Sequence, residues 1–302
     1  MNGFSAGGAI GAGFRLIARR PVAFLGWALT LMLIGVVPQF WALSELFASV
    51  GDLVRLAPES PDAAPSAEMF QMQARMMRIQ PVLFLSGTVS ATLVTAAVYR
   101  AALGLEEKSF LCLRLGSREL WLGLVTLLLA VVLPFAAMAL ILPIGVLAGV
   151  AAVAHVQALY WLIPVAIVIA IGFGTWAILR ISMAPVMSFS ENTFILPESW
   201  ALTRGHALKM FWVALALGAI VWAVQMVLFG AVIAAANAVI PLQDLFGAPG
   251  AKAFPDLTRL GYGFWFGVAA GVALFSTFVS VLFGAAWAEM YRGLRPAQTP
   301  AA

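Results

Sequence analysis

The sequence predicts an all-α, multi-pass membrane protein: a bundle of six transmembrane helices with short amphipathic helices at the membrane surface. Hydrophobic residues make up 63% of the 302 residues and charged residues only 10%, whereas soluble domains carry about 25% charged residues. Five stretches contain no Asp, Glu, Lys or Arg, and each is long enough to cross a hydrocarbon core of about 30 Å. These stretches are residues 21–44, 79–99, 120–179, 210–243 and 260–288. The third stretch, 60 residues long, must fold back on itself, so six crossings are expected.

The first part of the chain is expected to hold a surface helix, two crossings and a polar loop. Residues 4–20 place apolar side chains at helical spacing and end in arginines, as in a helix lying on the membrane. The first crossing, 22–43, lies in an apolar run longer than that of a signal peptide, so we expect an uncleaved helix. Prolines break residues 44–80 into a periplasmic loop, from which an amphipathic helix starts at Ser66. The second crossing is expected at 81–102.

Four methionines fall on one face of that amphipathic helix, at positions 69, 72, 76 and 77. Thioethers are soft ligands, so one hypothesis is a copper(I) site. The alternative is the apolar face of an interfacial or lid helix. No histidine or cysteine supports the metal, so we favour the apolar face and expect no cofactor.

The rest of the chain is expected to hold four further crossings, at residues 120–142, 158–180, 210–240 and 262–290. Residues 143–157 carry no charge and are either a continuation of the third helix or a helix lying in the interface. His155, in this connection, is expected to be a wetted interface residue rather than a catalyst. Residues 1–295 then form a single integral membrane domain, followed by a disordered tail at 296–302.

The positions of the basic residues predict the orientation. Twelve of the 17 lysines and arginines fall on the side that holds both termini and the segments 100–119 and 180–209. By the positive-inside rule this side is cytoplasmic. Each even-numbered crossing ends there with an arginine that can reach anionic headgroups and complements the helix dipole: Arg100, Arg180 and Arg292. A basic lead-in before each odd-numbered crossing completes a pattern that favours a threefold repeat of helix pairs.

Small and polar residues within the spans predict contacts between helices. Small residues let helices in lipid approach closely, so Ser86 and Ser90 are expected to face a neighbour. The sixth crossing carries a row of glycines at four-residue spacing, Gly263, Gly267 and Gly271. This row is expected to pack either inside the bundle or in a homodimer. Gln225, near the middle of the fifth crossing, predicts either a hydrogen bond between helices, worth about 0.6–2 kcal/mol, or a polar pathway.

Several functional classes are disfavoured by what the sequence lacks. No acidic or basic residue lies within the spans away from their ends, which argues against an ion-coupled carrier. Metalloprotease, serine-hydrolase and phosphate-loop motifs are absent, and a single cysteine excludes an intrachain disulfide. The basic residues are spread among loops, so nucleic acid is not an expected partner. An enzyme would need loop residues, and the test is whether Arg118, Glu198 and His206 come within hydrogen-bond reach.

The most distinctive stretch is LPESWALTRGHALKMFW, residues 196–212. It predicts a short amphipathic helix that starts at Pro197 and stops at Gly205, directly before the fifth crossing. Trp200 and Arg204 are candidates to contact lipid headgroups.

The motif Ser199-Trp200-x-Leu202-Thr203-Arg204-Gly205, together with the basic lead-ins, resembles a group of bacterial inner-membrane proteins. The group includes the membrane domain fused to some glycerophosphodiester phosphodiesterases, and stand-alone relatives. The resemblance implies a six-helix domain in the inner membrane. The 302 residues contain no counterpart of the hydrolase domain, so no activity or catalytic residue is carried over.

The sequence therefore favours a non-enzymatic accessory or scaffold protein that contacts membrane lipid and either a partner subunit or a second copy. One alternative is an uncoupled transporter or channel for a small or amphiphilic solute. In that case Gln225 and the small-residue faces would line the route. Another alternative is a lipid-modifying enzyme at the cytoplasmic interface.

Overall fold

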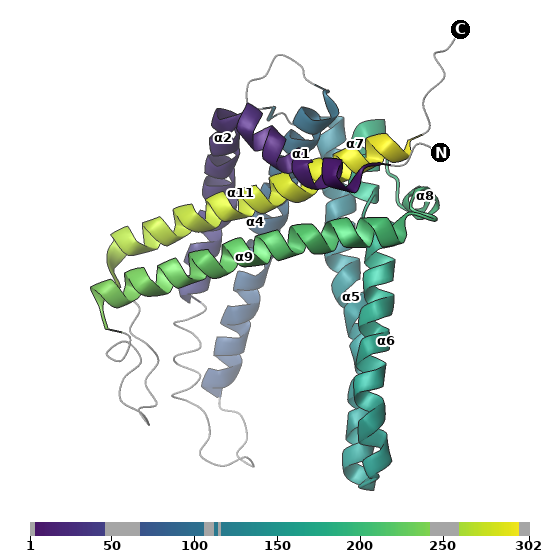
Figure 1. Cartoon of the computed structure of the whole chain (residues 1–302). Coiled ribbons are helices and arrows are strands. Elements are labelled where there is room, and N and C mark those ends of the chain that lie inside the picture. The colour runs from purple at the N-terminus through teal and green to yellow at the C-terminus, as the bar shows by residue number, and fades with distance from the viewer. Residues whose placement is uncertain (1–3, 46–66, 106–111, 114–115, 242–259, 296–302) are drawn as a thin grey trace. The chain divides into compact units, whose positions relative to one another are not determined.

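A computed structural model describes residues 4–45, 67–105, 112–113, 116–241 and 260–295, which are helical almost throughout (Figure 1). The described residues include six helices that are long and apolar enough to cross a membrane. They are Pro21–Glu45, Gln73–Leu103, Ser117–Ala154, Leu159–Glu191, Ala207–Val239 and Gly261–Leu294. A helix satisfies its own backbone hydrogen bonds, which lipid cannot do, so long apolar helices are the elements that can span. The all-α, multi-pass fold class is confirmed. Most of the predicted polar loop and the tail at 296–302 lie outside the described residues.

The N-terminal part contains α1 (Ala6–Arg19) and then α2 (Pro21–Leu31). Proline suits the first helical position because its missing N–H would be unpaired there in any case. The helix continues through a single π-helical turn, η1 (Met32–Val36), before it ends near residue 45. Helices therefore form where the sequence predicted them, at 4–20 and 22–43, and the position of α1 on the membrane surface stays a prediction.

The next helix, α4 (Ala67–Leu103), is one continuous helix with Pro81 inside it. The sequence had predicted two helices here, an amphipathic one from Ser66 and a crossing from residue 81. Proline removes one backbone hydrogen bond and can kink a helix without ending it. The helix continues on both sides of Pro81. Of the predicted methionine face, Met76 is half-buried and Met77 is exposed.

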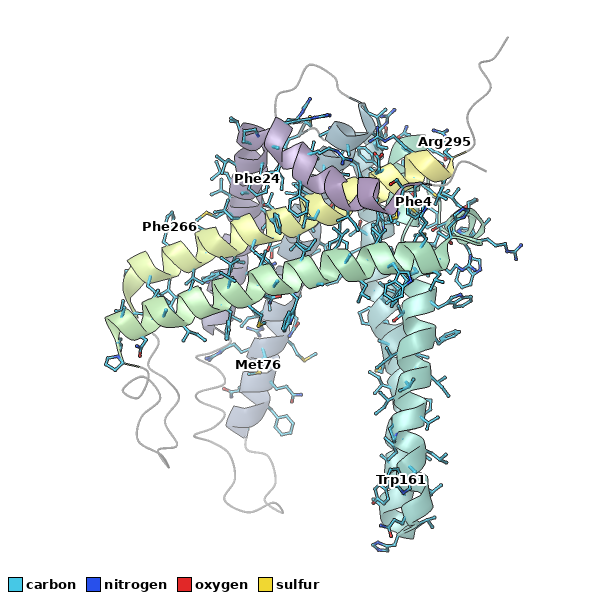
Figure 2. All side chains as sticks on the ribbon, viewed as in Figure 1. Phe4, Phe24, Met76, Trp161, Phe266 and Arg295 are labelled. Atoms are coloured by element: carbon cyan, nitrogen blue, oxygen red, sulfur yellow. The ribbon has the colours of Figure 1, made fainter. Side chains whose placement is uncertain are left out.

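The long uncharged segment folds into a hairpin of two helices, α5 (Ser117–Ala154) and α6 (Gln157–Ile181), which lie side by side (Figure 1). Helix α5 passes through Pro134 and Pro143, so residues 143–154 continue the third helix rather than forming a separate surface helix. The turn is made by His155, which is exposed and has a left-handed φ of 51°. Trp161 lies near this turn and is 77% exposed (Figure 2).

The remaining helices are α7 (Ala184–Glu191), α8 (Pro197–Leu202), α9 (Ala207–Val239) and α11 (Gly261–Leu294). The chain forms two compact units. Unit 1 comprises Met1–Leu16, Ala96–Leu217 and Leu282–Ala302, and unit 2 comprises Ile17–Thr95 and Gly218–Val281. Unit 1 thus holds most of α1, the end of α4, all of α5 to α8, the beginning of α9 and the end of α11. The threefold repeat stays a prediction.

Candidate functional site

The candidate site lies in unit 1, where α8 is tied to the end of α6. The main-chain oxygen of Arg180 accepts hydrogen bonds from Ser199 Oγ at 2.8 Å and from Thr203 Oγ1 at 3.5 Å. In return, Arg180 Nη1 donates to the main-chain oxygen of Trp200 at 3.3 Å. The last carbonyl groups of a helix have no partner within that helix, so these hydroxyl groups complete the end of α6.

Aromatic rings hold the same arginine from two directions. The rings of Trp176 and Trp200 meet edge to face, with centroids 4.9 Å apart. Arg180 Cζ lies 5.6 Å from the centroid of Trp176 and 5.8 Å from that of Trp200. A guanidinium over an indole face is attracted by the ring quadrupole. We call this set of five residues the Arg180 clamp: Trp176, Arg180, Ser199, Trp200 and Thr203.

The turn after α8 places Arg204 on the outside of the clamp. The backbone N–H of Arg204 donates to the oxygen of Ala201 at 3.2 Å, and Gly205 follows with a φ of 82°. This left-handed conformation favours glycine, as the motif predicts. The side chain of Arg204 is exposed and, within the described part of the chain, makes no hydrogen bond or ion pair. It borders an open hollow of about 430 Å³, which is also lined by Pro197, Trp200 and Ala201.

Arg100, by contrast, is part of a buried ion pair. Its guanidinium contacts the carboxylate of Glu119, and the two side chains are 13% and 4% exposed. Arg100 Nη1 also donates to the oxygen of Cys112 at 3.2 Å, and its Cζ lies 5.8 Å from the centroid of Phe189. The sequence had placed Arg100 among the lipid-headgroup anchors. The structure instead uses its charge to join α4 to the beginning of α5, where a carboxylate complements the helix dipole.

Arg292 is also paired, although at the surface. Its Nη2 lies 2.7 Å from Glu289 Oε2 one turn back on α11, and its side chain is 53% exposed. The four candidate arginines therefore differ in their surroundings: Arg100, Arg180 and Arg292 have partners within the chain, and Arg204 has none among the described residues.

Two further contacts in unit 1 were not identified from the sequence. The hydroxyl of Tyr291 donates to Glu191 Oε1 at 2.9 Å and accepts from Ser190 Oγ at 2.9 Å, which joins α7 to the end of α11. Glu119 lies at the third helical position of α5, and that position was an available signal because it favours a carboxylate. Its partner, Arg100, lies on another helix, so the spacing of residues along the chain could not predict this ion pair.

The beginning of the chain is fixed in unit 1 through Phe4. Lys209 Nζ donates to the oxygen of Phe4 and lies 4.6 Å from the centroid of its ring. Figure 2 shows Phe4 beside the end of α11, where a Cβ on Gly293 would lie 2.9 Å from Phe4 Cα. Phe4 is one of the apolar side chains of the surface helix expected at 4–20, and it is only 4% exposed. Phe4 precedes α1, and α1 itself buries a face that includes Ala9 and Gly13, small residues that allow close approach.

In unit 2, the serine face of α4 lies against the first crossing. Ser90 is buried, and a Cβ on Gly35 of η1 would lie 2.5 Å from Ser90 Oγ. Ser90 Oγ donates to the oxygen of Ser86 at 2.7 Å, and Thr92 Oγ1 donates to that of Thr88 at 2.7 Å. These hydroxyl groups are therefore satisfied within their own helix.

The glycine row of α11 does not pack against the described part of the chain, so of its two expected roles the homodimer contact stays a prediction. Apart from neighbouring residues and backbone of α11 itself, no described atom lies within 4 Å of a Cβ placed on any of the three glycines, Gly263, Gly267 and Gly271. The stripe that α11 buries is Ala269, Ala273 and Thr277, about half a turn away. Both rows repeat every four residues and both are small enough for close approach, so the four-residue period did not distinguish them.

Gln225 is a second correction in unit 2. The sequence had placed it in the interior, yet it is exposed on α9. The large residues Trp222 and Phe229 near it are more than 60% exposed as well. This part of α9 buries almost no side chain, so its mid-span amide has no interior to face.

The three residues that would have indicated an interfacial enzyme are not joined. His206 Nδ1 lies 3.2 Å from the oxygen of Arg204. Among the described residues, no hydrogen bond or ion pair links the side chains of Arg118, Glu198 and His206. In the same part of the chain, no group of three His, Cys, Asp or Glu side chains could hold a metal ion.

Comparisons with protein-family models, with curated proteins and with solved structures find no match for this chain. The resemblance carried by residues 199–205 stays a prediction. What the chain offers at this site is one arginine-centred clamp, one buried ion pair and one exposed arginine beside an apolar hollow.

Proposed function

We propose that the protein is a non-enzymatic accessory or scaffold protein of the bacterial inner membrane that contacts anionic lipid at the cytoplasmic headgroup layer. The observation that carries the proposal is the use of the basic residues in unit 1. Arg180 ties α6 to α8, and Arg100 ties α4 to α5. These contacts fix helix ends to one another, which is a structural role.

The orientation follows from the positive-inside rule. Unit 1 gathers the helix ends that carry most of the basic residues, and tryptophans accompany them at Trp176 and Trp200. Arginine and tryptophan are the residues that anchor a helix end at the interface. Both termini are therefore assigned to the cytoplasm.

Polar side chains support a scaffold more than a route for solutes. The hydroxyl groups of α4 bond to their own helix, and Gln225 faces outward rather than into an interior. A route through a protein needs polar groups that converge on one cavity.

Purification into nanodiscs of native lipid tests the proposal. Mass spectrometry of the discs is expected to find anionic phospholipid or a specific membrane protein enriched over empty discs made from the same membranes. A protein that enriches neither would contradict the proposed function.

A further inference from the structure

We propose that the hollow lined by Pro197, Trp200, Ala201 and Arg204 binds the phosphate group of an anionic phospholipid. The inference rests on the proposed function and names the site and the ligand. Its first support is the free charge. The side chain of Arg204 is exposed, and its guanidinium makes no hydrogen bond or ion pair within the described residues. A guanidinium offers five N–H donors, and its planar fork matches a phosphate in a bidentate manner.

The second support is the rigidity of the backbone that presents this charge. Thr203 Oγ1 donates to the oxygen of Ser199 at 3.0 Å, and the next turn is closed by Gly205 with its left-handed φ. Arg180 holds the other side of α8 through the oxygen of Trp200. A ligand that binds here does not have to order the chain first, so less binding free energy is lost to ordering.

The third support is the apolar character of the walls. The hollow contains the proline ring of Pro197, the methyl group of Ala201 and the indole of Trp200, which is 37% exposed. Its volume of about 430 Å³ is within the usual range of ligand sites, about 300–1,000 Å³, and exceeds what a bare phosphate would fill. A molecule that joins a phosphate to an apolar body satisfies both parts of the site.

The carboxylate nearest in sequence does not neutralise the site. Glu198 is exposed on α8, and no ion pair joins it to Arg204. The hollow therefore presents one uncompensated positive charge, which fits a phosphodiester with a single negative charge. Glu198→Gln is expected to leave binding unchanged or slightly stronger, because it removes a like-signed charge from the surroundings of the ligand.

The test is a lipid titration of the purified full chain in detergent, followed by native mass spectrometry. Phosphatidylglycerol and phosphatidylcholine are compared on the wild type, Arg204→Gln and Arg75→Gln. Arg75 is the matched control because it is an exposed arginine on α4, outside unit 1. Arg204→Gln loses a charge-assisted contact, so its affinity for the first phosphatidylglycerol molecule is expected to fall by about 10- to 100-fold. Arg75→Gln is expected to match the wild type.

A second variant blocks the hollow without removing the charge. Ala201→Trp is expected to weaken phosphatidylglycerol binding, as Arg204→Gln does. The helical circular dichroism signal of both variants is expected to match that of the wild type. Inorganic phosphate in the same titration separates the two sources of the ligand chemistry. If it displaces the lipid at equal concentration, the site is one for free phosphate and the lipid assignment is wrong.

Equal phosphatidylglycerol affinity in the wild type, Arg204→Gln and Ala201→Trp would also overturn the inference. That result would leave the proposed function standing as long as the wild type still enriches lipid in native nanodiscs. Failure of the nanodisc enrichment itself would refute the proposed function instead.

Discussion

Replacing Glu119 by glutamine is expected to destabilise unit 1 more than any comparable change at an exposed carboxylate. Glu119→Gln keeps the shape of the side chain and removes its charge. Arg100 would then remain 13% exposed, with no carboxylate opposite it. An uncompensated buried charge costs several kcal/mol, because its desolvation is no longer offset by the attraction to a partner.

The expected magnitude follows from the burial of the pair. With Glu119 only 4% exposed, breaking the pair falls in the range of about 3–5 kcal/mol that applies to buried ion pairs. That range corresponds to a factor of roughly 100 or more in the folding equilibrium. The exposed pair of Glu289 and Arg292 serves as the control, because surface pairs contribute only about 0.2–1 kcal/mol.

The assay is unfolding of the purified protein in mixed micelles by increasing sodium dodecyl sulfate, followed by circular dichroism. Glu119→Gln is expected to lower the midpoint strongly, and Glu289→Gln to leave it nearly unchanged. The double variant Arg100→Met with Glu119→Leu is expected to recover part of the loss, since it leaves no charge buried. Equal midpoints for Glu119→Gln and Glu289→Gln would show that the ion pair does not hold α4 to α5.

Three further predictions follow from backbone geometry and from charge. Gly293→Ala places a Cβ 2.9 Å from Phe4 Cα and is expected to release α1, seen as faster hydrogen exchange there, whereas Gly7→Ala has open space and should not. Gly205→Ala, at a φ of 82°, is expected to cost about 1 kcal/mol or more, whereas Gly218→Ala within α9 should be neutral or stabilising. Alkaline phosphatase fused after residue 60 is expected to be active and the same enzyme fused at the C-terminus inactive; the reverse pattern would overturn the orientation.

The hydropathy pattern predicted the six long apolar helices among the described residues, because uncharged runs of this length are suited to crossing a hydrocarbon core. It was less informative at prolines. Pro81 was expected to begin a helix and instead lies inside α4, and residues after Pro143 continue α5. Whether a proline kinks or ends a helix depends on the residues around it and on their tertiary contacts, which local spacing does not contain.

In the motif at residues 199–205, too, some features follow from local sequence rules and others depend on tertiary contacts. Its helix start, its glycine stop and the exposure of Arg204 could be predicted from local rules. The role of Ser199 and Thr203 could not be predicted from local rules, because both side chains donate to the main-chain oxygen of Arg180, about twenty residues earlier. Likewise the glycine row and the alanine stripe of α11 have the same period, and only the neighbours select which one is buried.

The arginines at the ends of α4, α6 and α11 look alike in sequence, since each follows an apolar span and precedes a loop. Their charges nevertheless have different surroundings: Arg100 contacts a buried carboxylate, Arg180 lies over the rings of Trp176 and Trp200, and Arg292 pairs with a carboxylate of its own helix. The positive-inside rule acts on the side of the membrane where a charge lies and does not select its partner. Arg100 and Arg292 have carboxylate partners, which weaken their attraction for a headgroup, whereas Arg180 is held by one carbonyl group and two rings. The arginine that is best placed to bind lipid is therefore Arg204, which ends no spanning helix and has no partner among the described residues.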